Sequence, residues 1–206
     1  MMNKFEHDKN YAKFLFRKDP NCDHSSYLSE FMAFIKSQKI TSPFTFAYVG
    51  DETNLMPNLT LNENILMNFS PRSLTTEKEN QFEEYLNLKQ NYYIKKLYNK
   101  LIDKDLIVHA ANPEMKKIAS LIKALITDSE YIFLENPEKD LSENIRILFT
   151  KALNTHLELN EINAFIYSSN EELWKPHCSH SVARNKYFQF HIESIIVDKT
   201  TKKTAA

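Results

Sequence analysis

Gly50 is the single glycine in this chain of 206 residues. Average usage of roughly 7% would place about fourteen glycines in a chain of this length. Glycine-rich phosphate loops need several residues without a Cβ, because only these let the backbone approach the phosphates closely. The sequence therefore excludes an intact loop of this kind. The chain has twenty asparagines, and we expect them to take over much of the turn structure, since Asn tolerates the left-handed conformation better than most residues.

Charge and cysteine content narrow the class of protein further. The chain carries 26 Lys and Arg against 27 Asp and Glu, so no overall field draws it toward nucleic acid or a membrane surface. Two cysteines cannot build a disulfide framework, and no apolar run reaches the roughly 18 residues of a membrane span. The first ten residues are polar and charged, unlike a signal peptide. We expect a reduced, cytoplasmic protein without direct membrane insertion.

Short apolar runs alternate with longer helical patterns, an order typical of βαβ units and a mostly parallel sheet. Strands are predicted at residues 11–17, 44–49, 131–134 and 163–167, and a β-rich run at 186–192. Helices are predicted at 25–37, 113–125 and 141–157. Three more helical stretches, at 59–69, 79–89 and 91–102, carry little strand signal and indicate a helical insertion.

The length and the hydrophobic fraction of 42% predict one globular domain over residues 1–206, with a sizeable buried core. We place the core of this domain at about 11–58 and 127–195 and the inserted helical subdomain at about 59–126. The polar, basic tail at about 198–206 is expected to be disordered.

The clearest motif reads Ala-Leu-Ile-Thr-Asp-Ser-Glu-Tyr-Ile-Phe-Leu-Glu-Asn-Pro, from Ala124 to Pro137. It resembles the Walker B region of the nucleotide-binding domain of ATP-binding cassette (ABC) transporters, where a helix and a short turn lead into an apolar strand ending in Asp-Glu-Pro. The resemblance puts Glu135 in the place of the aspartate that holds Mg²⁺, and Asn136 in the place of the catalytic glutamate. A neutral amide cannot act as a general base near pH 7, so we expect no hydrolysis.

The turn after the first strand is similar to the Walker A pattern G-P-N-G-x-G-K-S/T-S/T of the same family. All three glycines and the phosphate-binding lysine are replaced, while the Pro-Asn pair and the Mg²⁺-binding hydroxyl are kept. The replacing residues are Asp19, Cys22, His24 and Ser25, and the retained ones are Pro20, Asn21 and Ser26. Carboxylates in this turn would repel a polyphosphate that has already lost its ammonium partner. The resemblance therefore implies that nucleotide binding is lost, although a helix beginning at Ser25 still offers some attraction to an anion.

Three further elements of the family follow in order, each altered. Asp51 stands where the Q-loop glutamine usually stands, and Ser169 in the position of the switch histidine. The signature motif LSGGQ corresponds to Ala-Asn-Pro-Glu-Met at 111–115, with Asn112, Pro113 and Glu114 at its centre. Pro113 has no amide hydrogen for a γ-phosphate, and Glu114 brings a negative charge to the same place.

The resemblance extends over roughly residues 11–195 and implies an α/β fold of the P-loop NTPase type. In this fold a mostly parallel sheet is flanked by helices and carries an inserted helical subdomain. The family places several β-strands, including an aromatic residue that stacks on adenine, ahead of its phosphate loop. Here only ten residues precede the first predicted strand, so we expect the N-terminal β-subdomain to be truncated and the adenine platform to be missing.

The segment from Phe46 to Phe69 keeps the family's character better than the motifs with a direct role on ATP. In the family, this region helps form the groove that receives the coupling helix of a permease. Because charge steering is weak in a chain of net charge -1, partner binding is expected to depend on apolar anchors. The predicted anchors are Met56, Leu59, Met67 and Phe69.

These inferences predict a catalytically inactive ABC-type ATPase-like subunit with a structural or regulatory role and no cofactor. It would dock on a membrane permease or an active ATPase homologue, in the cytoplasm or at the inner face of the cell membrane. Two alternatives stay open. One is a slow or nucleotide-sensing ABC ATPase in which Ser26 and Glu135 still hold Mg²⁺, and the other is a soluble scaffold unrelated to transport.

Other clusters carry candidate chemistry of their own. His177, Cys178 and His180, with Cys22 and His24, are metal-ligand types, but they lack the spacing of a structural zinc site, and we expect no metal. Cys178 has no recognisable oxyanion element or orienting third group for covalent catalysis. The Tyr and Lys positions at 92–100 have helical spacing, which favours a solvated helix face over a nucleic-acid site. Trp174 is predicted to anchor a helix against the core.

Overall fold

The computed structural model describes residues 11–17, 27–38, 43–52, 54–69, 78–185, 187 and 189–195. Within them, a six-stranded sheet has the strand order β2-β3-β4-β1-β5-β6. The strands are β1 (Lys13–Phe16), β2 (Phe46–Val49), β3 (Tyr131–Glu135), β4 (Asn163–Tyr167), β5 (His180–Arg184) and β6 (Phe190–Ser194). Neighbouring strands pair in parallel, except that β6 runs antiparallel to β5. The predicted mostly parallel α/β sheet is thus confirmed.

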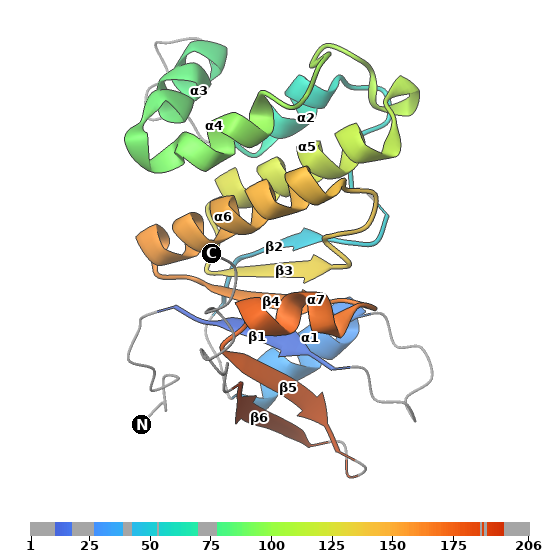
Figure 1. Ribbon diagram of the computed structural model, residues 1–206, viewed down its shortest axis with the longest axis vertical. Helices are drawn as coiled ribbons and strands as arrows, with labels where there is room; N and C mark the ends of the chain where they lie inside the picture. The colour runs from blue at the N-terminus through green and yellow to red at the C-terminus, as the bar shows by residue number, and fades with distance from the viewer. Residues whose placement is uncertain are drawn as a thin grey trace, which may run out of the picture.

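Helices cover both faces of this sheet (Figure 1). The α-helices are α1 (Tyr27–Ser37), α2 (Leu61–Met67), α3 (Lys78–Asn87), α4 (Tyr92–Tyr98), α5 (Pro113–Ile126), α6 (Glu143–Asn160) and α7 (Glu171–Trp174). Short 3₁₀ turns lie at η1 (Lys89–Asn91), η2 (Val108–Ala110) and η3 (Lys175–His177). Figure 1 shows α2, α3 and α4 stacked beyond α5 and α6, so the helices of the predicted insertion form a layer on one side of the molecule.

The two faces of the sheet differ in chemistry. Successive side chains of a strand point to opposite faces, so alternation along each strand decides what each face presents. Toward α5 and α6 the central strands present aliphatic residues: Leu15, Ala47, Val49, Ile132, Leu134, Ala164 and Ile166. Toward α1 they present aromatic residues: Phe14, Phe16, Phe133, Phe165 and Tyr167, which pack with Phe31 and Phe34 of the helix. The core therefore has an aliphatic half and an aromatic half, with the sheet between them.

Asparagine fulfils its expected role in turns mainly through its side chain. Among the described residues, the non-glycine residues with positive φ are Asn136 at 42°, Asp140 at 64° and Glu161 at 54°. Of the asparagines that the structure describes, only Asn136 adopts the left-handed conformation. Elsewhere the amide groups bond to the backbone, as at Asn112, whose Oδ1 accepts from the Met115 amide at 2.8 Å, and at Asn91, whose Nδ2 donates to the Tyr85 carbonyl at 2.7 Å.

β5 is an element that the sequence pattern does not predict. Its five residues read His-Ser-Val-Ala-Arg, with one β-branched residue, so their intrinsic preference for a strand is weak. The segment becomes a strand because it pairs with β1 on one side and β6 on the other. The β-rich run predicted at 186–192 corresponds to β6, which begins at Phe190 and ends at Ser194. The predicted tail at 198–206 lies outside the described residues.

Candidate functional site

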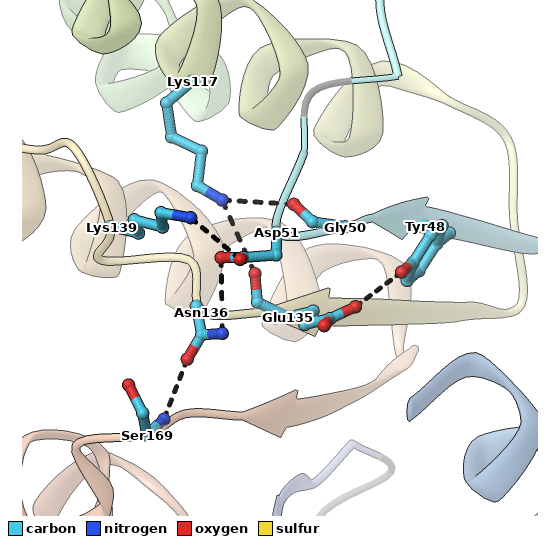
Figure 2. Close-up of polar contacts among 8 residues, drawn as sticks. All are labelled: Tyr48, Gly50, Asp51, Lys117, Glu135, Asn136, Lys139 and Ser169. Atoms are coloured by element: carbon cyan, nitrogen blue, oxygen red, sulfur yellow. Dashed lines mark hydrogen bonds and ion pairs between the residues drawn. The ribbon is translucent and has the colours of Figure 1, made fainter. Parts of the chain in front are cut away.

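Three loops meet where β2, β3 and β4 end. Because these strands are parallel, their carboxyl ends lie at one edge of the sheet, where open α/β sheets place their ligands. Asp51 follows β2, Asn136 follows β3 and Ser169 lies just beyond β4. Figure 2 shows these three residues side by side, with Lys117 reaching down from α5 above them. The three positions that the resemblance assigns to the Q-loop, Walker B and switch elements thus lie at one edge of the sheet.

Asn136 connects the three loops. Its backbone amide donates to the Tyr167 carbonyl at 2.7 Å, and its side-chain Oδ1 accepts a hydrogen bond from the Ser169 amide at 2.8 Å. Its Nδ2 donates to Asp51 Oδ1 at the longer distance of 3.4 Å. The left-handed φ of 42° turns the chain away from β3 and directs the side chain between its neighbours. Both halves of the amide therefore have partners within the protein.

Asp51 has a second partner in Lys139, whose Nζ lies 2.8 Å from Asp51 Oδ2. The hydrogen bond from Lys139 is the largest cause that lowers the pKa of the Asp51 carboxyl, and Asn136 lowers it further. The pKa of Lys139 is raised by the same contact. Asp51 is thus held as a carboxylate between a cation and an amide donor.

The Glu135 side chain lies on the aromatic face of the sheet. Its Oε2 accepts a hydrogen bond from the Tyr48 hydroxyl at 2.6 Å, and the Tyr48 ring stacks on Phe133 with 5.7 Å between centroids. Burial, and next the bond to Glu135, raise the pKa of Tyr48, so its hydroxyl remains a donor. The carboxylate in the Walker B position is therefore engaged by a tyrosine from the neighbouring strand.

Lys117 is a site residue that the motif comparison misses. It is 1% exposed, and its ammonium donates to the carbonyl oxygens of Gly50 at 3.3 Å and Glu135 at 3.5 Å. Burial lowers the pKa of Lys117, while Asp51 and other carboxylates oppose that shift. The burial of Lys117 could have been predicted from helical periodicity, because it lies in the same buried stripe of α5 as residues 120, 121 and 124.

The signature-like residues stabilise the beginnings of two helices. Asn112 caps α5 through its bond from the Met115 amide, and Pro113 occupies the first turn, where no donor is needed. Glu114 Oε1 accepts a hydrogen bond from the backbone amide of Ser142, the N-cap of α6, at 2.7 Å. This bond lowers the pKa of Glu114. The negative charge expected at this position thus ties α5 to the start of α6.

Two tyrosines stack where α1 begins. The rings of Tyr27 and Tyr167 lie face to face with 3.3 Å between centroids, and the two hydroxyls are hydrogen-bonded to each other. Tyr27 is the last residue of the segment that is similar to Walker A. The other positions of that segment all lie outside the described residues: Asp19, Pro20, Asn21, Cys22, Asp23, His24, Ser25 and Ser26.

The four predicted partner-binding residues lie in α2 or within a few residues of its ends, and they differ in exposure. Met56 is 52% exposed and Met67 47% exposed, whereas Leu59 is half-buried. Phe69 packs inward, with its ring centroid 5.1 Å from Phe82 and 5.4 Å from Tyr85. A capping box between Thr60 and Glu63 fixes the start of α2, and Asn64 bonds to the Met56 backbone amide at 2.7 Å. The exposed methionines therefore project from a firmly held segment.

The other candidate residues from the sequence are Cys178, the possible metal ligands around it, and Trp174. Cys178 is 3% exposed, and burial raises its pKa to about 12, so its thiol stays protonated at neutral pH. Across the described ranges, no group of three or more His, Cys, Asp and Glu residues is arranged to hold a metal ion. Trp174 packs against Phe149 and donates from its indole nitrogen to Glu138 Oε2 at 2.8 Å, which confirms its expected place in the core. Among the helices of the described residues, none has the length and apolarity needed to cross a bilayer.

Known proteins resemble this chain in structure but not in sequence. Neither the family models nor the curated protein sequences give a match. An RNase-L inhibitor structure matches 89% of this chain and 34% of its own, with a TM-score of 0.62 and 18% identity. An archaeal ribosome recycling factor, in complex with an archaeal ribosomal stalk protein, matches 89% of this chain and 34% of its own, with a TM-score of 0.59 and 16% identity.

A dimeric ATP-binding cassette in a post-hydrolysis state, bound to ADP and phosphate, matches 86% of this chain and 70% of its own, with a TM-score of 0.58 and 13% identity. The chain spans about a third of the length of the first two proteins and most of the third. Identities this low carry information about the fold alone. The chain has the fold of an ABC ATPase nucleotide-binding domain.

Proposed function

We propose that this chain is a non-hydrolysing ABC ATPase-like subunit with a structural or regulatory role, docking on a membrane permease or an active ATPase partner. The observation that carries the proposal is the amide of Asn136 at the general-base position, with its Oδ1 bonded to the Ser169 amide and its Nδ2 to Asp51. An amide has no basic lone pair near pH 7 with which to take a proton from water.

The carboxylate in the metal-binding position supports the same conclusion. A Mg²⁺ ion needs oxygen ligands free to complete an octahedral shell. Glu135 instead accepts a 2.6 Å hydrogen bond from Tyr48 on the aromatic face of the sheet. This hydrogen bond competes with a metal ion for the carboxylate, which supports the proposed loss of Mg-nucleotide binding.

Two lysines already supply positive charge at the same place. Lys139 pairs with Asp51 at 2.8 Å, and the buried Lys117 ammonium bonds to carbonyl oxygens at the ends of β2 and β3. Both ammonium groups are thus engaged by acceptors of the protein itself, one by a carboxylate and the other by backbone carbonyls. This arrangement favours a constant shape over a cycle of binding and release.

A constant shape suits a docking subunit. Met56 precedes α2 and Met67 is its last residue, and both side chains are exposed in the segment where the resemblance implies a groove for a permease's coupling helix. One structurally similar protein was solved with a ribosomal stalk protein, and another is a dimer. Protein contacts of these kinds are what we propose for this chain, through apolar anchors.

Thermal unfolding with and without millimolar Mg-ATP tests the loss of nucleotide binding. A ligand at about 100 times its Kd would stabilise the native state by roughly 2.7 kcal/mol and raise the unfolding midpoint by several degrees. We expect no shift and no release of phosphate. A clear shift without phosphate release would favour a nucleotide sensor, and phosphate release that Asn136→Ala abolishes would overturn the proposal.

Affinity purification from the native host tests the docking role. We expect a permease or an intact ATPase to co-purify with the wild-type chain and to be lost with the double variant Met56→Asp/Met67→Asp. Ile102→Asp is the matched control, because Ile102 is apolar and 95% exposed but lies outside the segment around α2. Recovery of neither kind of partner, or loss of both with the control as well, would contradict docking through this surface.

A further inference from the structure

A cavity of about 660 Å³ lies at the edge of the sheet opposite the site described above. Its walls include the residues just before β3 and β4, the ends of α5 and α6, and one side of α3. Pockets for small organic molecules span about 300–1,000 Å³. The lining residues are Phe69, Gln81, Glu84, Tyr85, Leu88, Leu125, Ile126, Thr127, Asp128, Ser129, His156, Asn160 and Ile162.

About half of this lining is apolar. Phe69 and Tyr85 bring two rings with centroids 5.4 Å apart, and Leu125, Ile126 and Ile162 supply aliphatic surface. Burial raises the pKa of Tyr85 to about 12, so its phenol stays neutral at physiological pH. These walls fit the body of an aromatic or aliphatic ligand.

The described residues of the lining carry charge of one sign. Among them, Glu84 and Asp128 are ionisable carboxyl groups and none is Lys or Arg. The His156 Nδ1 lies 3.2 Å from the Asn160 amide nitrogen, a donor, which leaves the ring proton on Nε2. Burial lowers the pKa of His156 to about 4, so the ring adds no positive charge at pH 7. An anion would be repelled here and a cation attracted.

One polar group in the wall has no partner in the described part of the chain. Ser129 is 7% exposed, and no described residue bonds to its hydroxyl, whereas the nearby Thr127 hydroxyl donates to the Lys123 carbonyl at 2.7 Å and accepts from Asn68 at 2.8 Å. Buried hydroxyls are normally paired, and an exception needs an explanation. A ligand group or a water held with it would supply the partner that the fold does not.

We propose that this cavity binds a small organic monocation, an amine or guanidinium attached to an aromatic or aliphatic body. The charged group lies toward Glu84 and Asp128, and the body packs on Phe69, Ile126 and Ile162. Neither part of the proposal depends on the sheet edge that carries Asp51, Asn136 and Ser169, because no residue of one site belongs to the other.

Three probes with one body and different charge test the chemistry: 4-phenylbutylamine, 4-phenylbutanol and 4-phenylbutyrate. Their dissociation constants are measured on the full chain by ligand-observed NMR. We expect the amine to bind about tenfold tighter than the alcohol, and the carboxylate to bind most weakly, as two nearby carboxylates dictate. Equal affinities, or no binding of any probe, would overturn the proposal.

Variants tie the binding to this cavity. Glu84→Gln/Asp128→Asn should cost the amine about tenfold in affinity and leave the alcohol unchanged. The matched control, Glu143→Gln/Glu158→Gln, removes two exposed carboxylates from α6 that do not line the cavity, and it should change neither. Equal losses in both double variants would overturn the assignment, since the effect would then reflect net charge.

A free amine and a basic side chain of a partner protein share this chemistry. Acetyl-phenylalanyl-arginine amide presents the same groups on a peptide backbone. Tighter binding of the dipeptide than of phenylbutylamine identifies a partner's side chain as the occupant, and the reverse identifies a free small molecule. Both results support the cation site. Ser129→Leu places a larger side chain in the cavity wall and should weaken the binding of both compounds, and unchanged binding of both would contradict the site.

Discussion

A Cβ added to Gly50 would lie 2.8 Å from the hydroxyl oxygen of Tyr48. Real Cβ atoms essentially never approach other heavy atoms this closely, so the tyrosine excludes a side chain at residue 50. The conformation of the backbone does not require the glycine, because no described glycine has a positive φ. The absence of a side chain at Gly50 instead leaves room for the hydroxyl that bonds to Glu135 at 2.6 Å.

Gly50→Ala is therefore expected to disturb the bond between Tyr48 and Glu135. The added methyl group meets the far end of a side chain that can move, so the loss is about that of one hydrogen bond to a charged group, roughly 1.5–3 kcal/mol. Urea unfolding of the variant and the wild type measures the difference in free energy. The same substitution in a Tyr48→Phe background should cost less, and an undiminished cost there would show that the hydroxyl is not the obstacle.

The fold could be predicted from the sequence where local pattern and tertiary environment agree. The central strands show apolar runs because both of their faces are covered, and α5 shows its periodicity because one stripe packs on the sheet. β5 could not be predicted in this way. Its residues have weak strand preference, and only pairing with β1 and β6, distant in sequence or reached across a turn, makes them a strand.

The candidate site could be predicted by position but not by contact. The motif order puts Asp51, Asn136 and Ser169 after successive strands, and parallel pairing brings the carboxyl ends of these strands to one sheet edge. The motif order does not predict which side chains contact these residues. Lys117 comes from α5 and Tyr48 from the strand beside Glu135, and such contacts between elements depend on packing angles that no single-sequence pattern records.

Glu138 accepts a hydrogen bond from the chain's single tryptophan, so the loss of this bond can be followed by fluorescence. One carboxylate oxygen accepts from the Trp174 indole at 2.8 Å, and the other from the Ser168 hydroxyl. Glu138→Ala leaves a buried indole N–H without an acceptor, and we expect it to lower the free energy of unfolding by about 2–3 kcal/mol. Tryptophan fluorescence during urea unfolding reports the change from Trp174 alone.

Two further variants separate this contact from loss of charge. Glu138→Gln keeps one acceptor oxygen and should lose less stability than Glu138→Ala. Glu143→Ala removes an exposed carboxylate a few residues away and should be within about 0.5 kcal/mol of wild type. If all three variants unfolded at the same denaturant concentration, the indole bond would not contribute to stability.

Lys117 should make stability rise in mildly alkaline solution. Burial lowers its pKa in the folded state, so the unfolded chain binds the proton more tightly. The resulting penalty is present below the folded pKa and disappears as the pH rises toward the ordinary value of 10.5. Lys117→Met keeps an unbranched side chain, one atom shorter, and removes the ammonium. We expect the stability of the wild type relative to this variant to increase as the pH rises from 7 toward 10.5, as measured by urea unfolding, and a constant difference would contradict an ammonium held at a cost.

His156 should make the protein sensitive to mild acid. Burial lowers the pKa of His156 from its ordinary value of 6.5 to about 4. As the pH falls, the histidine of the unfolded chain therefore takes up a proton before that of the folded protein. The neutral ring contributes no penalty at pH 7, and stability is lost progressively between about pH 6.5 and pH 4, amounting to about 2 kcal/mol at pH 5. His156→Gln should remove most of the difference between pH 7 and pH 5 in urea unfolding. The control His177→Gln changes a more exposed histidine, whose pKa is also lowered, and should remove less of it. An equal pH dependence in the wild type and His156→Gln would mean that the ring is charged in the folded protein.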